Sequence, residues 1–119
     1  MTLFEERPLT FKAAKTTFSE RVVRLALSIP AGKVTTYAII ARKAGGQAPM
    51  LARSVTGILS KAWEKGEKKI PFHRIVYSDG KIWTSPEYHK KRMALYKKEG
   101  ISVDKKNRIV DFADKLHEF

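Results

Sequence analysis

Breaks rich in glycine and proline divide the first half of the chain into three short apolar patterns. Residues 30–32 (Pro-Ala-Gly) end the first pattern, Gly45 and Gly46 end the second, and a charged loop at 65–69 ends the third. Within the first pattern, apolar residues recur every three or four positions from 18 to 29, which places them on one face of a helix. We therefore predict helices over residues 18–29, over 36–44, and from Pro49 or Met50 to about Lys65.

Residues suited to helix capping stand at the predicted starts. Thr17 and Glu20 have the spacing of a capping box, and either Thr35 or Thr36 can cap the second helix after a short extended segment. The second and third helices flank a glycine-containing turn, which is a helix-turn-helix pattern. In that motif the second of the two helices is presented to DNA.

The second half of the chain contains turn signals that predict small β elements. Asp79-Gly80 lies between two β-prone runs, residues 75–77 and 81–83, and predicts a hairpin that would form a small wing. A last helix is predicted over residues 87–99, with Gly100 as its C-terminal cap, and a short hairpin around 105–107 follows. The predicted fold class is mainly α with small β elements, a winged helix-turn-helix.

Three regions are expected along the chain: an N-terminal extension at 1–16, a DNA-binding domain at 17–103, and a C-terminal extension at 104–119. Residues 1–16 show no clear apolar period, which is why they are read as an extension. We expect the protein to act as a monomer.

The chain is strongly basic, with 24 Lys and Arg against 12 Asp and Glu and a net charge of +12. Residues 33–108 alone contain 18 basic and 6 acidic residues, so one continuous stretch carries the excess. This distribution predicts a polyanionic partner, with nucleic acid favoured over a membrane or a merely solubilising surface.

Several function classes are excluded by the residues that are missing. The sequence contains no cysteine, which excludes disulfides, thiolate-bound zinc, iron–sulfur clusters and thiol nucleophiles. His89 and His117 stand too far apart for a metal motif, so no metal and no cofactor is expected. No apolar run approaches the roughly 20 residues of a membrane span. We expect a protein that does not bind membranes and is cytoplasmic or nucleoid-associated.

Residues 70–76 read Ile-Pro-Phe-His-Arg-Ile-Val. They resemble the Ile-Pro-Cys-His-Arg-Val active-site motif of the O6-alkylguanine-DNA alkyltransferases, with Phe72 at the position of the acceptor cysteine. Residues 29–37, 52–55, 78–80 and 98–100 are similar to further blocks of that family, in the same order. The resemblance covers roughly residues 18–103, and the missing cysteine makes the alkyltransferase-like proteins the nearer match.

The resemblance implies a role in DNA binding for a set of residues around the helix-turn-helix. Tyr37 is expected to crowd the 3′ phosphate of the target nucleotide, and Arg53 to fill the stack that a flipped base leaves. The planar guanidinium suits this role because it stacks on bases and donates hydrogen bonds. The predicted DNA-binding residues are Thr35, Thr36, Tyr37, Arg53 and Ser54.

A lesion pocket is implied in the same way, with Phe72 at its floor. His73 and Glu99 correspond to the proton-relay pair of the enzymes and are expected to survive as scaffold. The predicted pocket residues are Leu59, Phe72, His73, Arg74, Ile75, Ser78, Ser85 and Glu99. Ala62 and Ser85 are smaller than their counterparts in the enzymes, which predicts a roomier pocket that accepts larger adducts.

No catalytic residue is predicted. Dealkylation needs a deprotonatable nucleophile, and the phenylalanine side chain has no lone pair with which to attack a carbon. The expected function is to bind duplex DNA through the minor groove, flip O6-alkylguanine into the pocket and flag it for nucleotide excision repair proteins. The alternatives are a helix-turn-helix regulator or architectural protein without base flipping and, less favoured, a hydrolase that uses His73 and Glu99.

Overall fold

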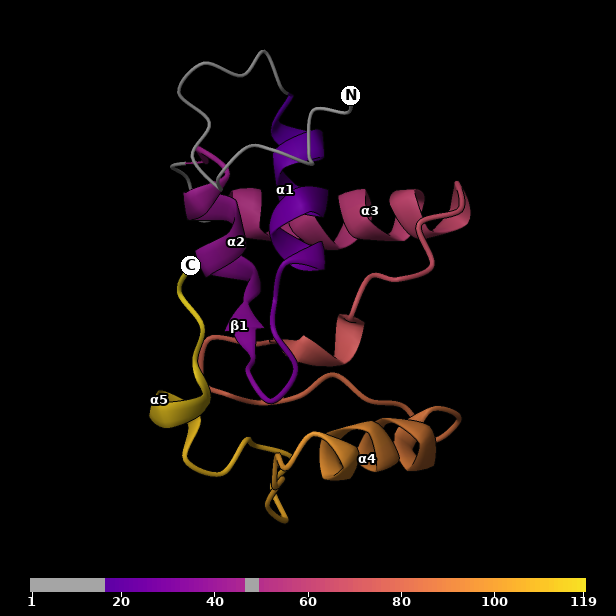
Figure 1. Ribbon diagram of the computed structural model, residues 1–119, viewed down its shortest axis with the longest axis vertical. Helices are drawn as coiled ribbons and strands as arrows, with labels where there is room; N and C mark the ends of the chain where they lie inside the picture. Colours follow the sequence, from indigo (N-terminus) through magenta and orange to yellow (C-terminus); the bar gives the residue numbers. More distant parts are fainter. Residues whose placement is uncertain (1–16, 47–49) are drawn as a thin grey trace.

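The computed structural model describes residues 17–46 and 50–119, and Figure 1 shows two stacked parts joined by a short sheet. Helices α1 (Phe18–Leu27), α2 (Tyr37–Lys43) and α3 (Met50–Glu64) form one part, while α4 (His89–Lys98) and α5 (Phe112–Lys115) belong to the other. Pro49, a predicted helix start, and the N-terminal extension lie outside the described residues. The helix-turn-helix fold class is confirmed.

The capping residues act as the sequence predicts. The Thr17 hydroxyl accepts a hydrogen bond from the Glu20 N–H at 3.1 Å, and the Thr36 hydroxyl accepts one from the Ile39 N–H at 3.1 Å. Each bond satisfies one N–H that has no partner within the first helical turn. Thr36, and not Thr35, is therefore the residue that starts α2.

Apolar side chains from the three helices form the first of two buried clusters. Val22 and Leu25 of α1 meet Ile40 of α2 and Val55 and Leu59 of α3. All five are almost completely buried, so this cluster packs α3 against α1 and α2.

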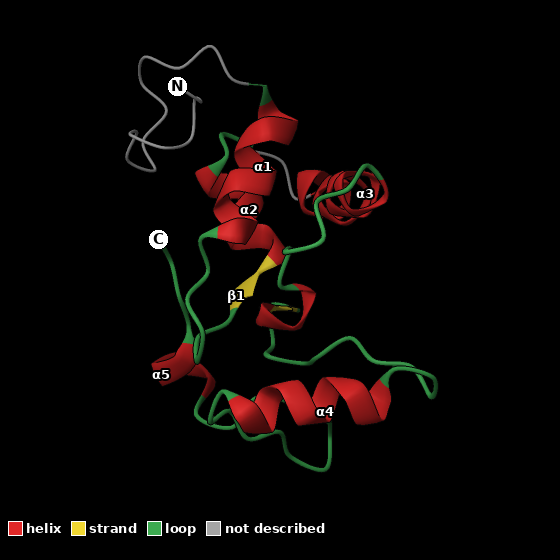
Figure 2. Ribbon diagram, turned by 45° about the vertical axis from the view of Figure 1, so that its right-hand side comes forward, coloured by secondary structure: helices red, strands yellow, loops and turns green. Residues whose placement is uncertain are grey.

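The small sheet is parallel, and the predicted hairpin is only partly present. Strand β1 (Thr35–Thr36) pairs with β2 (Ile75–Val76), with Thr35 opposite Ile75. The predicted hairpin between residues 75–77 and 81–83 forms only at its turn, where the Tyr77 N–H donates to the Lys81 carbonyl at 2.9 Å, because the Ile82 N–H donates to the Asn107 carbonyl at 2.8 Å instead. Figure 2 shows β1 between α2 and the part of the molecule that contains α4. The tight turn itself is confirmed, since the Gly80 N–H donates to the Tyr77 carbonyl at 2.8 Å.

Helix α4 ends as predicted at a glycine in the left-handed region. Gly100 has φ 72°, and the N–H of Ile101 reaches back to the Tyr96 carbonyl at 2.9 Å. The N–H of Gly100 donates to the Lys97 carbonyl at 3.1 Å, which completes the double hydrogen bond of a Schellman motif. The chain leaves α4 in a defined direction, directly after Glu99.

The C-terminal segment, expected as an extension, packs on the domain. A turn around residues 104–108 brings Val103 opposite Ile109, so the predicted second hairpin is present as a single bridge. Leu116 then lies in parallel beside Val34, and the His117 N–H donates to the Val34 carbonyl at 2.7 Å. Ile109 joins Val34 in the second buried cluster.

Removing the first helix cap tests this account of α1. Thr17→Ala should lower the free energy of unfolding by about 1 kcal/mol, since the Glu20 N–H loses its only side-chain acceptor at an exposed site. Thr17→Ser keeps the hydroxyl and should unfold like the parent in a urea titration. Equal midpoints for all three proteins would contradict the capping assignment.

Candidate nucleic-acid interface

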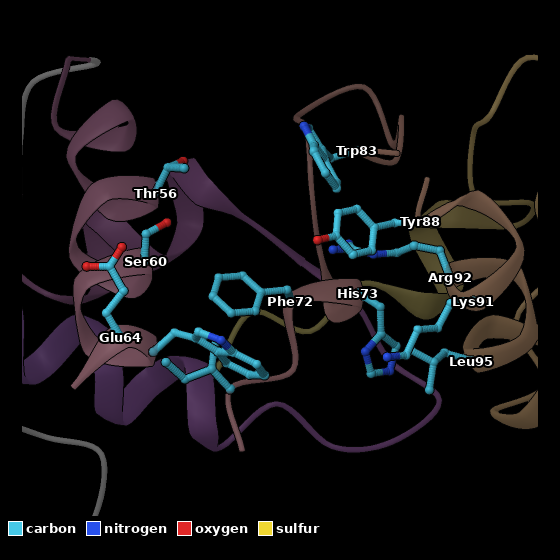
Figure 3. Close-up of a pocket in the computed structure, with 12 residues that line it drawn as sticks. Thr56, Ser60, Glu64, Phe72, His73, Trp83, Tyr88, Lys91, Arg92 and Leu95 are labelled. Atoms are coloured by element: carbon cyan, nitrogen blue, oxygen red, sulfur yellow. The ribbon is translucent and has the colours of Figure 1, made fainter. Parts of the chain in front are cut away.

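A cleft of about 620 Å³ lies between α3 and the segment that leads into α4. Figure 3 shows Phe72 and His73 between the two walls, with Phe72 nearer α3 and His73 nearer α4. The cleft is lined by aromatic, cationic and small polar side chains, which are Thr56, Ser60, Trp63, Glu64, Ile70, Phe72, His73, Trp83, Tyr88, Lys91, Arg92 and Leu95.

A single 3-10 turn, η1 (Phe72–Arg74), places the two floor residues side by side. The Arg74 N–H donates to the Pro71 carbonyl at 2.9 Å and closes this turn, while buried Ile70 anchors it to the first cluster. The Phe72 ring meets Trp63 edge-on, with 5.5 Å between the ring centroids. The floor is thus apolar on the α3 side.

Beneath the floor, the carboxylate of Glu99 accepts hydrogen bonds from three residues on two segments, His73 and Arg74 of η1 and Gly32 of the turn after α1. His73 Nε2 lies 2.6 Å from Oε2, and Arg74 donates from Nη2 at 2.8 Å and from Nε at 3.0 Å to Oε1. The Gly32 N–H donates at 3.0 Å, and the Glu99 side chain is only 9% exposed. Arg74 also donates from Nη1 to the Ile29 carbonyl at 2.8 Å, so the network spans α1, η1 and α4.

The protonation states of this network follow from its contacts. Burial alone would raise the pKa of Glu99, but hydrogen bonds from Arg74, Gly32 and His73 outweigh it and lower the pKa to about 2. Burial lowers the pKa of His73, more than the hydrogen bond to Glu99 raises it. At neutral pH a neutral His73 therefore donates from Nε2 to an ionised Glu99 and keeps Nδ1 as an acceptor.

The predicted pocket residues divide into those that line the cleft and those that do not. Phe72 and His73 line it. Arg74 and Glu99 lie beneath the floor and act by holding it. Leu59 and Ile75, both 0% exposed, are corrections to the prediction, because core packing keeps their side chains away from any ligand.

Ser78 and Ser85 lie outside the lining of the cleft, and their expected contact with the lesion stays a prediction. Ser78 is exposed on the turn after β2, and the Ser85 hydroxyl accepts from the Tyr88 N–H at 3.4 Å without lining the cleft. Ala62 faces a different groove, between α1 and α3. Neither Ala62 nor Ser85 is among the residues that line the cleft, so nothing in this structure supports the expectation that they enlarge it.

The predicted DNA-binding residues divide into those at the surface and those that are buried. Arg53 and Ser54 are exposed on α3, and Tyr37 is half-buried at the start of α2, where its ring centroid lies 5.8 Å from that of Tyr77. Thr35 and Thr36 are 0% and 4% exposed, so their side chains cannot reach a ligand at the surface. These two residues instead set the position of Tyr37, Thr35 through β1 and Thr36 through the cap of α2.

Sequence reasoning missed most of the cleft walls. Trp63 and Trp83 carried no assignment, although exposed tryptophans within a basic stretch are a signal for base stacking. The spacing of Tyr88, Arg92 and Leu95 predicts one face of a helix, and that face forms the second wall.

Within the part of the chain that the structure describes, no three His, Asp or Glu side chains gather as a metal site. Across residues 17–46 and 50–119, no helix is long and apolar enough to cross a membrane.

A family profile, described as the DNA-binding domain of 6-O-methylguanine DNA methyltransferase, matches residues 17–101. The chain belongs to this family. It is 38% identical over 93 residues to the "DNA base-flipping protein" of Escherichia coli strain K12, covering 77% of this chain and 68% of that protein. It is also 34% identical over 89 residues to the methylated-DNA–protein-cysteine methyltransferase of Methanothermobacter thermautotrophicus, covering 75% of this chain and 47% of that protein.

A solved structure agrees with these matches. S. pombe Atl1, in complex with damaged DNA containing O6-carboxymethylguanine, superposes with a TM-score of 0.66 and 26% identity. The match covers 84% of this chain and 94% of Atl1. With Phe72 at the position of the acceptor cysteine, the chain is an alkyltransferase-like protein.

The depressed pKa of Glu99 makes a prediction for acid stability. A carboxyl group with a lowered folded-state pKa stabilises the fold fully above its unfolded value of 4.5, and this contribution disappears as the pH falls to about 2. At about 1.4 kcal/mol per pKa unit, the free energy of unfolding should fall by about 3 kcal/mol across this range.

Urea unfolding of the parent and of Glu99→Gln at pH 6 and pH 2.5 measures this loss. Glu99→Gln should be less stable at pH 6 and should show a smaller decrease on acidification than the parent. Glu87→Gln, at an exposed acid just before α4, is the matched control and should follow the parent. If the free energy of unfolding of Glu99→Gln fell by as much as that of the parent between pH 6 and pH 2.5, the lowered pKa of Glu99 would not be the source of the acid sensitivity.

Proposed function

We propose that this protein binds duplex DNA containing an O6-alkylated guanine through the minor groove, flips the damaged nucleotide into the cleft and holds it without reaction. The observation that carries the proposal is an aromatic cleft whose floor has Phe72 where the family's enzymes have their acceptor cysteine. The relatives named for base flipping and for binding damaged DNA support the same reading.

Flipping is needed because an atom inside a base stack cannot reach a cleft, and it costs a few kcal/mol of stacking and pairing. Arg53, exposed on α3, is suited to occupy the vacated stack. Tyr37 directly follows β1, and its ring packs beside the ring of Tyr77. These contacts restrict the side chain, which suits it to a steric contact with a phosphate. We assign these two residues to driving and holding the flipped state.

The walls are suited to retain a flipped base. Trp63 and Phe72 on one side and Trp83 and Tyr88 on the other offer flat apolar surfaces, and stacking contributes about 1–3 kcal/mol per base. The net charge of +12 adds a sequence-independent attraction to the duplex.

No step of dealkylation is open to these residues. Phe72 has no nucleophilic atom, and the sequence has no cysteine to replace it. The hydrolase alternative is not favoured, because the Glu99 carboxylate already accepts hydrogen bonds from Arg74 and Gly32, and His73 Nε2 is hydrogen-bonded to Glu99.

We propose that the complex with the flipped base marks the lesion for nucleotide excision repair proteins. Family analogy supports this repair step. We also propose that the protein acts as a monomer.

Titration of two duplexes that differ only by one O6-methylguanine tests the proposal. We expect at least tenfold tighter binding to the lesion, or about 1.4 kcal/mol, at a fixed salt concentration near physiological. A regulator without base flipping would bind both duplexes equally, and that result would overturn the proposal.

Arg53→Ala tests the role of the exposed arginine of α3. The loss of one stacking and hydrogen-bonding group should weaken lesion binding by about 1–3 kcal/mol and reduce the preference over guanine. Arg42→Ala, at an exposed arginine in the last turn of α2, removes the same charge and should weaken binding to both duplexes alike. If both variants lost the preference for the lesion duplex over the guanine duplex equally, Arg53 would not be the residue that fills the vacated stack.

A further inference from the structure

One wall of the cleft carries positive charge that no neighbouring carboxylate neutralises. Lys91 and Arg92 both line it from α4, a helix without acidic residues between His89 and Lys98. The acidic side chain that lines the cleft, Glu64, lies on the opposite wall (Figure 3). Among the described residues, the ion pairs within 4 Å involve neither Lys91 nor Arg92.

The guanidinium of Arg92 is held in place by aromatic rings. Its central carbon lies 5.2 Å from the centroid of the Trp83 ring, and Trp83 in turn lies 6.2 Å from Tyr88. A cation in this position gains a cation–π interaction, and Arg92 also interacts with the hydroxyl of buried Tyr96. The planar guanidinium has five N–H donors, more than these contacts use. The side chain is half-buried, which reduces the screening of its charge by solvent.

A fixed, partly desolvated guanidinium is well suited to an oxyanion, because it can donate two parallel hydrogen bonds. The ammonium of Lys91, on the preceding residue, adds a second positive charge to the same wall. An exocyclic substituent of a flipped base that lies against this wall would have these groups as neighbours. A neutral substituent would gain only apolar contact there, whereas a carboxylate would also gain charge-assisted hydrogen bonds.

We propose that Arg92, assisted by Lys91, is a specificity-determining residue that favours O6 substituents carrying a carboxylate over neutral substituents of the same size. This inference rests on the proposed function and concerns which adducts the cleft prefers. A backbone phosphate of the flipped nucleotide presents the same oxyanion chemistry. We assign the carboxylate of the substituent because Arg92 lines the cleft beside Trp83 and Tyr88, where the base itself would lie.

The test compares two duplexes that differ in one functional group, O6-carboxymethylguanine and its neutral amide, O6-carbamoylmethylguanine. The parent should bind the carboxylate about tenfold more tightly, and Arg92→Gln should reduce this ratio to about twofold or less. Lys91→Gln should reduce it partly, and Arg92→Lys should keep part of it. Lys90→Gln, which removes the same charge from an exposed residue of α4 outside the cleft, should leave the ratio unchanged.

Binding of the neutral amide adduct by each variant serves as the measure of a correctly folded cleft. A ratio near one in the parent, with both adducts bound more tightly than guanine, would overturn the inference and leave the proposed function standing. If neither adduct is preferred over guanine, the proposed function fails as well.

A second arm distinguishes the source of the oxyanion. The duplexes are prepared again with an uncharged methylphosphonate at the 3′ phosphate of the adduct. If Arg92→Gln weakens binding of both adducts equally, and the methylphosphonate abolishes that effect, Arg92 contacts the backbone and the inference is wrong. A carboxylate preference that persists with the methylphosphonate supports it.

Discussion

The ionised carboxylate of Glu99 joins three parts of the molecule that are distant in sequence. Glu99 lies at the end of α4, and its carboxylate accepts hydrogen bonds from Gly32 in the turn after α1 and from His73 and Arg74 of η1. Removing one partner of a buried ion pair commonly costs about 3–5 kcal/mol, because the other charge remains desolvated. The distance between the floor and the α4 wall of the cleft therefore depends on this one side chain.

The same network accounts for how a family of enzymes can include a member without a reactive group. His73, Arg74 and Glu99 position the floor, whatever residue stands at 72. With phenylalanine there, the floor becomes a packing surface that meets Trp63 edge-on. Under the proposed function, an alkyl group in the cleft would meet an apolar surface at the position where the family's enzymes have a nucleophile.

Local sequence signals predicted the helices well because the forces that start and end them are local. Thr17, Thr36 and Gly100 each satisfy backbone groups within a few residues of themselves. The parallel pairing of β2 with β1 joins residues 40 positions apart, so no local signal predicts it. The Asp79-Gly80 pair predicts the turn but not the pairing of the following residues with 107–108.

The site was predicted less completely than the fold. A resemblance locates a residue along the chain but does not report whether its side chain faces the cleft, which is why Leu59 and Ile75 were misplaced. The walls come from α3 and from the segment leading into α4, and only tertiary packing brings Trp63 near Trp83 across the floor.

The central claim is that the damaged base enters this cleft. Both tryptophans of the chain, Trp63 and Trp83, line it, so their fluorescence reports directly on its occupancy. At saturating protein–DNA ratios, a duplex with O6-methylguanine should quench the tryptophan emission strongly by stacking, and an otherwise identical guanine duplex should quench it much less. Equal quenching by the two saturated duplexes would contradict the account, because it would mean that the lesion stays outside the cleft.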